Sequence, residues 1–170
     1  SLGLIATGSL ASFSLLGMLV GGFLSGYLAD RFGRKHVMNV SIMVYALLTV
    51  PIFFVHSYDA FALCRIFSGL GVGAVIPLSV TMVSEFAPTR YRGTFVTLTK
   101  TFMMLGWVIA GVVALFVVPA FGWRMCYLIG GFPFVYGILM HFFMPESVQW
   151  LLSRGRTEEA LEIVNDINRR

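Results

Sequence analysis

The stretch GYLADRFGRK, residues 26–35, separates two long hydrophobic runs and decides how the chain folds. It contains all four Asp, Arg and Lys side chains of the first 58 residues. Asp30 ends the first run, and three basic residues follow it within five positions. Gly33 lies among them and gives the backbone the freedom that a tight turn requires. The stretch is therefore predicted to be a short polar turn between two membrane-spanning helices.

The rest of the chain has the composition of a protein that lies in lipid. Of its 170 residues, 58% are hydrophobic and 12% are charged, whereas a soluble domain carries about 25% charged residues. Its 18 glycines fit the same environment, because glycine is commoner in membrane helices than in soluble ones. This composition excludes a disordered chain and an ordinary soluble enzyme.

On both sides of the turn, five hydrophobic runs are long enough to cross a bilayer, for which a helix needs about 20 residues. We expect these spans at residues 4–29, 37–55, 60–84, 94–118 and 123–144. Residues 1–145 are thus predicted to form the membrane part, and residues 146–170 a separate polar segment. The sequence begins at Ser1 inside a hydrophobic run, so we expect it to be part of a longer protein.

The basic residues indicate which side of the membrane each connection faces. Nine of the twelve lie in the first connection, the third connection and the tail: Arg31, Arg34, Lys35, Arg90, Arg92, Arg154, Arg156, Arg169 and Arg170. Cytoplasmic loops carry an excess of Lys and Arg, so we expect these segments and the C-terminal end in the cytoplasm. This pattern explains the net charge of +4 without a nucleic-acid partner, since the basic residues form no stripe on a soluble domain.

The tail is predicted to contain an amphipathic helix. Gly155 is expected to stop one helix, and Thr157 to cap the next. The apolar residues of that helix recur at helical spacing: Ala160, Leu161, Val164 and Ile167. We therefore expect a cytoplasmic helix that lies on the bundle or on the membrane surface.

A faint internal repeat relates the first and fourth spans. Residues 16–17, 22 and 32–33 recur 89 positions later as 105–106, 111 and 121–122. The two copies are three spans apart and cross the membrane in opposite directions, as in the inverted repeats of transporters. A chance match among so many glycines is the alternative.

Four motifs of this chain resemble those of the major facilitator superfamily. Residues 26–35 are similar to its G-x-L-A-D-R-x-G-R-K signature between the second and third helices. The others are RIFSGLGVGAVIP at 65–77, EFAPTRYRG at 85–93, and PESVQWLL at 145–152, where Val148 and Gln149 replace the usual Pro-Arg. The resemblance implies an all-α integral membrane protein. Its N-terminal half-bundle would contribute five transmembrane helices, numbers two to six, plus the cytoplasmic amphipathic helix.

Two basic residues inside the spans are candidate substrate contacts, because placing charge in lipid is costly. Arg65 lies about 8 Å below the outer surface and Lys100 about as deep from the other side. Snorkelling to the interface is the alternative. The resemblance implies a role of Arg65 in substrate or proton coupling, and implies that the helix of Lys100 lines the transport path. The predicted substrate-binding residues are Arg65, Thr97, Lys100, Thr101, Met104 and Trp107.

The resemblance also implies a cytoplasmic charge network that latches the two transporter halves together in the outward-facing state. Its predicted members are Asp30, Arg31, Gly33, Arg34, Glu85, Arg90 and Arg92. Solvated ion pairs that contribute little are the alternative.

Other kinds of site are not predicted. Neither Cys64 nor Cys126 has metal-ligand spacing, and the three histidines, His36, His56 and His141, lie near the ends of spans. No nucleophile and base stand in a catalytic pattern. We therefore expect no metal, no cofactor and no enzyme activity. Since no Asp or Glu lies in the middle of a span, a proton-carrying carboxylate is expected in the absent helix one.

Taken together, the composition, the spans and the motifs predict a secondary transporter that works by alternating access. Two cations without a mid-membrane acid favour a small organic anion, and the resemblance implies an aromatic or nicotinic carboxylate carried with protons. A sugar porter is the alternative, and a non-transporting receptor on the same fold is a third candidate. The expected partners are the substrate, protons, the lipid bilayer, helix one and the C-terminal half, in a bacterial inner membrane.

Overall fold

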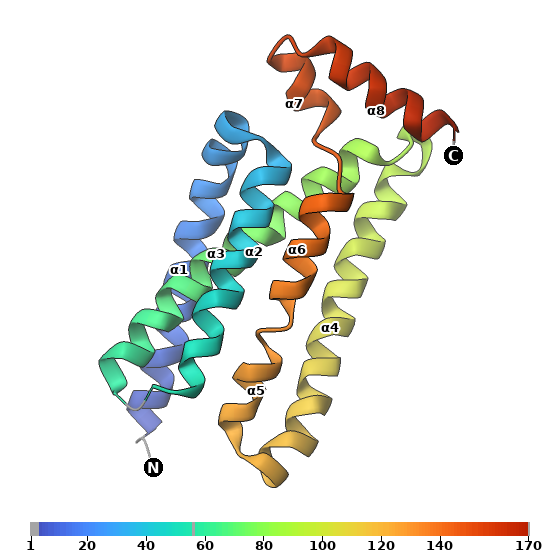
Figure 1. The fold of residues 1–170 in the computed structure, drawn as a ribbon. Coiled ribbons are helices and arrows are strands. Elements are labelled where there is room, and N and C mark those ends of the chain that lie inside the picture. Colours follow the sequence, from blue (N-terminus) through green and yellow to red (C-terminus); the bar gives the residue numbers. More distant parts are fainter. Residues whose placement is uncertain (1–3, 56, 170) are drawn as a thin grey trace.

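Four long helices and a fifth, broken one run alongside one another in the computed structural model, which describes residues 4–55 and 57–169 (Figure 1). Side chains are described for residues 8–55 and 57–165. Ser1, His56 and Arg170, and the side chains of Ile167 and Arg169, therefore lie outside the described residues. The described part of the chain contains helices and turns but no strand.

The helices follow the predicted order. They are α1 (Leu4–Phe32), α2 (Arg34–Thr49), η1 (Val50–Phe53), α3 (Tyr58–Phe86), η2 (Thr89–Tyr91), α4 (Arg92–Phe121), α5 (Trp123–Ile129), α6 (Pro133–Phe143), α7 (Val148–Ser153) and α8 (Thr157–Arg169). Five stretches are long and apolar enough to cross a membrane, which confirms the predicted number: Gly8–Phe32, Arg34–Phe53, Tyr58–Phe86, Thr89–Phe121 and Trp123–Phe143.

The bundle has two ends, each with a corner made by a single glycine. At Gly33 the backbone turns from α1 into α2 with φ 99°, and at Gly122 it turns from α4 into α5 with φ 83°. Other residues rarely adopt such positive φ values. We call these the Gly33 end, where α7 and α8 also lie, and the Gly122 end (Figure 1). The two glycines are the positions that the 89-residue repeat relates.

Glycines bring α1 and α3 into close backbone contact. A Cβ atom added to Gly17 or Gly21 of α1 would collide with the carbonyl oxygen of Ile66 or Leu70. A Cβ atom added to Gly73 of α3 would collide with the backbone of Met18. Such contacts replace the hydrophobic driving force that helices lack in lipid. The closest helix pair in the bundle is therefore held by backbone packing.

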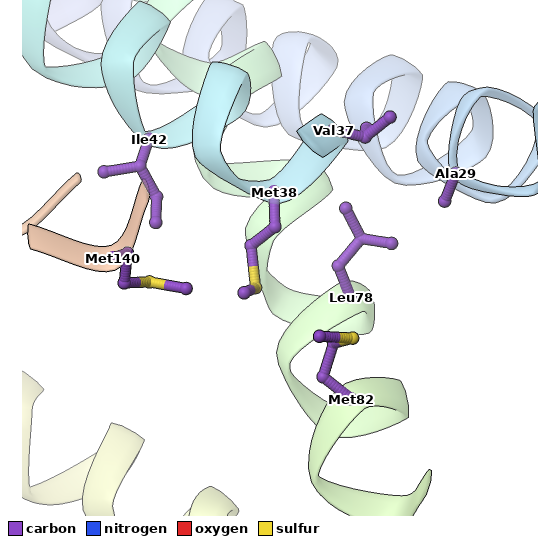
Figure 2. Packing of buried hydrophobic residues seen from close by; sticks show 7 residues of the cluster. All are labelled: Ala29, Val37, Met38, Ile42, Leu78, Met82 and Met140. Carbon is purple, nitrogen blue, oxygen red and sulfur yellow. The ribbon is translucent and has the colours of Figure 1, made fainter. Parts of the chain in front are cut away.

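A hydrophobic cluster fills the space between four helices near the Gly33 end (Figure 2). It consists of Ala29, Val37, Met38, Ile42, Leu78, Met82 and Met140. In the same region Asn39 Nδ2 donates a hydrogen bond of 3.1 Å to the Gly137 carbonyl and so joins α2 to α6. The cluster holds α1, α2, α3 and α6 together directly beneath the charged turn.

The fourth helix stands apart from this cluster. None of the residues of α4 is buried, and α4 lies to one side of α2 and α3 in Figure 1. An apolar cavity of about 390 Å³ opens between its first turns and the other helices, with Phe95 of α4 facing Met82, Phe86 and Met140. A helix that is apolar on all sides is covered by lipid or by further protein.

One prediction about an element boundary was wrong, and one confirmed span has an interrupted helix. The span expected at 123–144 is present as Trp123–Phe143, but its helix is broken between Ile129 and Pro133, because proline lacks an N–H and its ring clashes with the carbonyl four residues earlier. In the tail, Arg156 rather than Thr157 precedes the helix, since its carbonyl accepts the Ala160 N–H at 3.2 Å. The stop at Gly155 is confirmed by its φ of 73°.

The apolar stripe of α8 is only partly covered. Ala160 is buried, whereas Leu161 is 60% exposed and Val164 is 38% exposed. The helix preceding it, α7, was not predicted as a separate element. It is short, and Ser147 caps it by accepting a hydrogen bond from the Trp150 N–H.

The α1–α3 contact predicts opposite effects for two glycine substitutions. Gly73→Ala forces the helices apart and is expected to lower the Tm of the full-length protein in detergent by at least about 3 °C. Gly26→Ala is the control, because nothing lies within 4 Å of its added Cβ and alanine favours a helix. Equal Tm values for the two variants would contradict the proposed role of close backbone packing.

Candidate functional site

An ion pair joins α2 to α3 at the Gly33 end. The guanidinium of Arg34, at the start of α2, contacts the carboxylate of Glu85 near the end of α3. Their side chains are 19% and 6% exposed, so both charges are largely removed from water. Removing one partner from such a pair leaves an uncompensated charge and costs more than breaking a surface pair. The structure thus brings together two of the residues predicted for the latch.

The segment that follows α6 completes this network. Ser147, which is fully buried, donates a hydrogen bond from its hydroxyl to Glu85 Oε2. The carboxylate of Glu146 accepts hydrogen bonds from the backbone N–H groups of Lys35, at 2.8 Å, and Ser147, at 3.0 Å. Glu146 therefore caps the N-terminus of α2, where free N–H groups and the helix dipole favour a negative charge.

Gly33 is required at the corner for a second reason besides its positive φ. A Cβ atom at this position would lie 2.5 Å from Glu146 Oε2. The absence of a side chain therefore lets the carboxylate reach the Lys35 N–H in the first turn of α2. Both the positive φ and the lack of space for a Cβ atom therefore require glycine at position 33.

The C-terminal end of α1 is capped from α7 and the residue after it. Trp150 Nε1 donates to the Asp30 carbonyl at 3.0 Å, and Arg154 Nη2 donates to the Asp30 and Arg31 carbonyls at 3.2 and 2.9 Å. These are among the carbonyls that have no partner within the helix. Asp30 and Arg31 thus contribute backbone atoms to the network. The Arg31 side chain instead lies over the Phe32 ring, 5.6 Å from its centroid.

Two residues predicted for the latch lie outside this network. Arg90 and Arg92 are both exposed, and the Arg90 guanidinium lies over the neighbouring Tyr91 ring. Among the described side chains, ion pairs join Arg34 to Glu85 and Arg156 to Glu159. Arg90 lies in the η2 turn and Arg92 begins α4, and neither forms an ion pair with Glu85.

The capping residues were not predicted as site residues, although the motif at 145–152 contains three of them. They are Glu146, Ser147, Trp150 and Arg154. The replacement of Pro-Arg by Val148 and Gln149 weakens any claim, based on this motif, that the tail makes the family's usual arginine contacts. The structure shows that Arg154, a few residues later, donates to α1.

Arg65 occupies a second site, near the Gly122 end. It lies seven residues into α3, which is about 10 Å along the helix axis. Its Nη2 donates a hydrogen bond to the hydroxyl of Tyr127 on α5. The guanidinium carbon is 4.9 Å from the centroid of the Tyr127 ring and 5.7 Å from that of Phe61. Arg65 is therefore held by one hydroxyl and two aromatic faces.

One nitrogen of Arg65 is left without a partner. In the described part of the chain, Arg65 Nε is the one buried side-chain polar atom that has neither a hydrogen bond nor an ion-pair partner. Buried polar groups are nearly always satisfied, and an exception calls for an explanation. The chain itself covers this nitrogen, so its N–H is an unsatisfied buried donor rather than an open binding position.

Three aromatic rings surround the Arg65–Tyr127 contact. Phe61, Trp123 and Tyr127 lie edge to face with one another, each pair of ring centroids 5.9 Å apart. Aromatic pairs prefer this arrangement and gain from it beyond their burial. The rings form a rigid, mostly apolar setting for the arginine.

The predicted stripe on α4 lies elsewhere. Lys100 is eight residues from the start of α4, on the Gly33 side of the bundle, whereas Arg65 lies toward the other end. The hydroxyl groups of Thr97 and Thr101 donate to the carbonyls of residues 93 and 97 of their own helix. Met104 and Trp107 are 64% and 72% exposed. The structure does not bring the stripe and Arg65 together within the described chain.

Comparison with known proteins identifies the family. The sequence profile of the family described as "Sugar (and other) transporter" matches residues 4–170. The niacin transporter NiaP of Acinetobacter baylyi is 41% identical over 96% of this chain and 37% of its own length. The 4-hydroxybenzoate transporter PcaK of the same organism is 36% identical over 94% of this chain and 35% of its own length.

A solved structure supports the same assignment. The xylose transporter XylE from E. coli, in a partially occluded inward-open conformation, superposes with a TM-score of 0.88 and 25% identity. The alignment covers 95% of this chain and 44% of that one. The chain thus spans less than half the length of these proteins. It is an integral membrane segment that belongs to the sugar (and other) transporter family of the major facilitator superfamily, a family of membrane transporters and not of enzymes.

Proposed function

We propose that the whole protein is a secondary transporter that carries a small organic carboxylate together with protons by alternating access. The observation that carries this proposal is the Arg65 guanidinium, which lies against two aromatic rings and forms no ion pair with a carboxylate of the described side chains. A guanidinium is the side chain best suited to bind a carboxylate when it is partly removed from water. The relatives named for niacin and 4-hydroxybenzoate support this class, because both compounds carry a carboxyl group on an aromatic ring.

We further place the exposed stripe of α4 on the wall of the substrate pathway. Its members are Thr97, Lys100, Thr101, Met104 and Trp107. A polar and aromatic stripe on an otherwise apolar helix suits a water-filled path between transporter halves. The described helices leave this side of α4 uncovered, which supports the placement.

We assign the Gly33 end to the cytoplasmic side of a bacterial inner membrane. The excess of Lys and Arg at this end supports the orientation, and the bacterial relatives support the location. Residues 1–145 then form five helices of the N-terminal half, and residues 146–170 begin the central loop. The Arg34–Glu85 pair, with the caps that surround it, acts in this proposal as a conformational latch. Its loss would shift the balance between conformers.

A sugar porter is the second candidate, and the likeness to the xylose transporter favours it. A sugar carries no charge, however, and would leave the Arg65 guanidinium without a counterion. A carboxylate matches the charge of this arginine and accepts its N–H groups.

Uptake measurements with the full-length protein in right-side-out, energised membrane vesicles distinguish these candidates. We expect labelled nicotinate or 4-hydroxybenzoate to accumulate, and a protonophore to abolish the accumulation, because proton entry drives it. Accumulation of labelled xylose that is indifferent to pH would contradict the carboxylate proposal. Correct insertion without uptake of any of the three compounds would favour a non-transporting receptor.

Arg65→Ala and Lys100→Ala test the proposed contacts. Each variant is expected to lower Vmax/KM for the transported carboxylate about 10- to 100-fold, the effect of removing a charged hydrogen-bond partner. Membrane insertion should be unchanged. Arg156→Ala is the matched control, because its side chain is half exposed and lies in the tail. Normal transport by both test variants would show that Arg65 and Lys100 do not bind substrate and only anchor their helices at the membrane interface.

The latch predicts non-additive stability effects. Arg34→Gln and Glu85→Gln are each expected to lower the free energy of unfolding by about 1–3 kcal/mol. The double variant should cost no more than either single change. The exposed pair Arg156–Glu159 serves for comparison and should contribute less than about 1 kcal/mol. Additive losses for Arg34 and Glu85 in a double-mutant cycle would show that the pair is not coupled.

A further inference from the structure

We propose that Tyr127 is a positioning residue for Arg65. Its hydroxyl and its ring hold the guanidinium in one orientation in which it meets the carboxylate of the substrate. This inference rests on the proposed function, in which Arg65 is a substrate contact. It assigns a role to α5 that neither the sequence motifs nor the relatives indicate.

The contacts of Arg65 divide its donors into two groups. An arginine offers five N–H groups in one rigid plane and has no acceptor of its own. Nη2 is directed to the Tyr127 hydroxyl, while the plane rests beside the rings of Tyr127 and Phe61. Because the plane is rigid, fixing Nη2 also fixes the direction of the other N–H groups. The guanidinium is therefore oriented before any carboxylate arrives.

Tyr127 is itself well anchored. It follows Trp123 by one helical turn on α5, and the two rings meet edge to face at an interplanar angle of 89°. The ring of Phe61 meets it at 87° from α3. Arg124, on the same short helix, donates from Nη2 to the Val55 carbonyl at 3.3 Å. The helix α5 thus has contacts with both neighbouring segments that hold the phenol in place.

The helix α5 is separated from α4 and from α6 by interruptions in the backbone, so its direction differs from theirs. It is bounded by the positive-φ corner at Gly122 and by the break between Ile129 and Pro133. Seven residues therefore form a short rod whose direction the rest of the fifth span does not dictate. The rod carries the residue that holds Arg65.

The expected energetic effect is one of preorganisation. Without Tyr127, the long side chain of Arg65 would be ordered only when the substrate binds, and ordering one such side chain weakens binding roughly 2- to 10-fold. Tyr127→Phe keeps the ring and removes the hydroxyl, so we expect KM for nicotinate to rise about 3-fold. Tyr127→Leu removes both, and we expect a rise of about 10-fold. Vmax should stay within about twofold in each case, because the transport cycle itself is untouched.

The experiment measures labelled nicotinate uptake by the full-length protein in proteoliposomes, with KM and Vmax determined for each variant. Tyr136→Phe and Tyr136→Leu are the matched controls, because Tyr136 lies on α6, is 55% exposed and is not part of the proposed site. Both controls should have an unchanged KM. Tyr127→Phe is also made in an Arg65→Lys background, where the planar fork is gone and no further rise in KM is expected.

The outcomes distinguish this inference from the proposed function. A graded rise in KM that vanishes in the Arg65→Lys background supports the positioning role. An unchanged KM in both Tyr127 variants, while Arg65→Ala loses uptake, overturns the inference and leaves the proposed function standing. A fall in Vmax and in Tm without a change in KM overturns it as well, because it indicates a structural role. Normal uptake by Arg65→Ala would overturn both. If Tyr127→Leu fails to insert, Tyr127→Phe alone decides.

Discussion

The rest of the structure depends on how two helix ends are satisfied at Gly33. The first helix ends at Phe32 and the second begins at Arg34, so no loop separates them. The last carbonyls of one helix and the first N–H groups of the other meet at the edge of the membrane, where unsatisfied backbone groups are costly. A segment more than 110 residues later supplies the partners: Glu146 for the N–H groups, and Trp150 and Arg154 for the carbonyls.

This constraint connects the fold to the site. Because Glu146 must reach the corner, the fifth span has to end beside the first two, and Ser147 then contacts Glu85. The ion pair of Glu85 with Arg34 ties the third helix to the same place. The hydrophobic cluster of α1, α2, α3 and α6 lies directly beneath (Figure 2). Charge, capping and apolar packing thus converge at one end of the bundle, while the Arg65 site lies toward the other.

Features that depend on local sequence were predictable, and features that depend on distant contacts were not. The number of spans follows from run length, and the turn at Gly33 follows from one glycine among charges. The break before Pro133 could have been predicted from the Gly130–Gly131 pair and the proline. The pairing of Arg65 with Tyr127 could not, because 16 phenylalanines, six tyrosines and three tryptophans offer many equivalent rings. Only the tertiary arrangement selects one.

The single-glycine corners also bear on how the protein is made. A single residue separates α1 from α2, and a single residue separates α4 from α5. We expect each pair to enter the membrane as one hairpin, with its corner glycine already in the left-handed conformation. The charges around Gly33 would then keep that corner from crossing, whereas the corner at Gly122 carries one arginine and can be translocated.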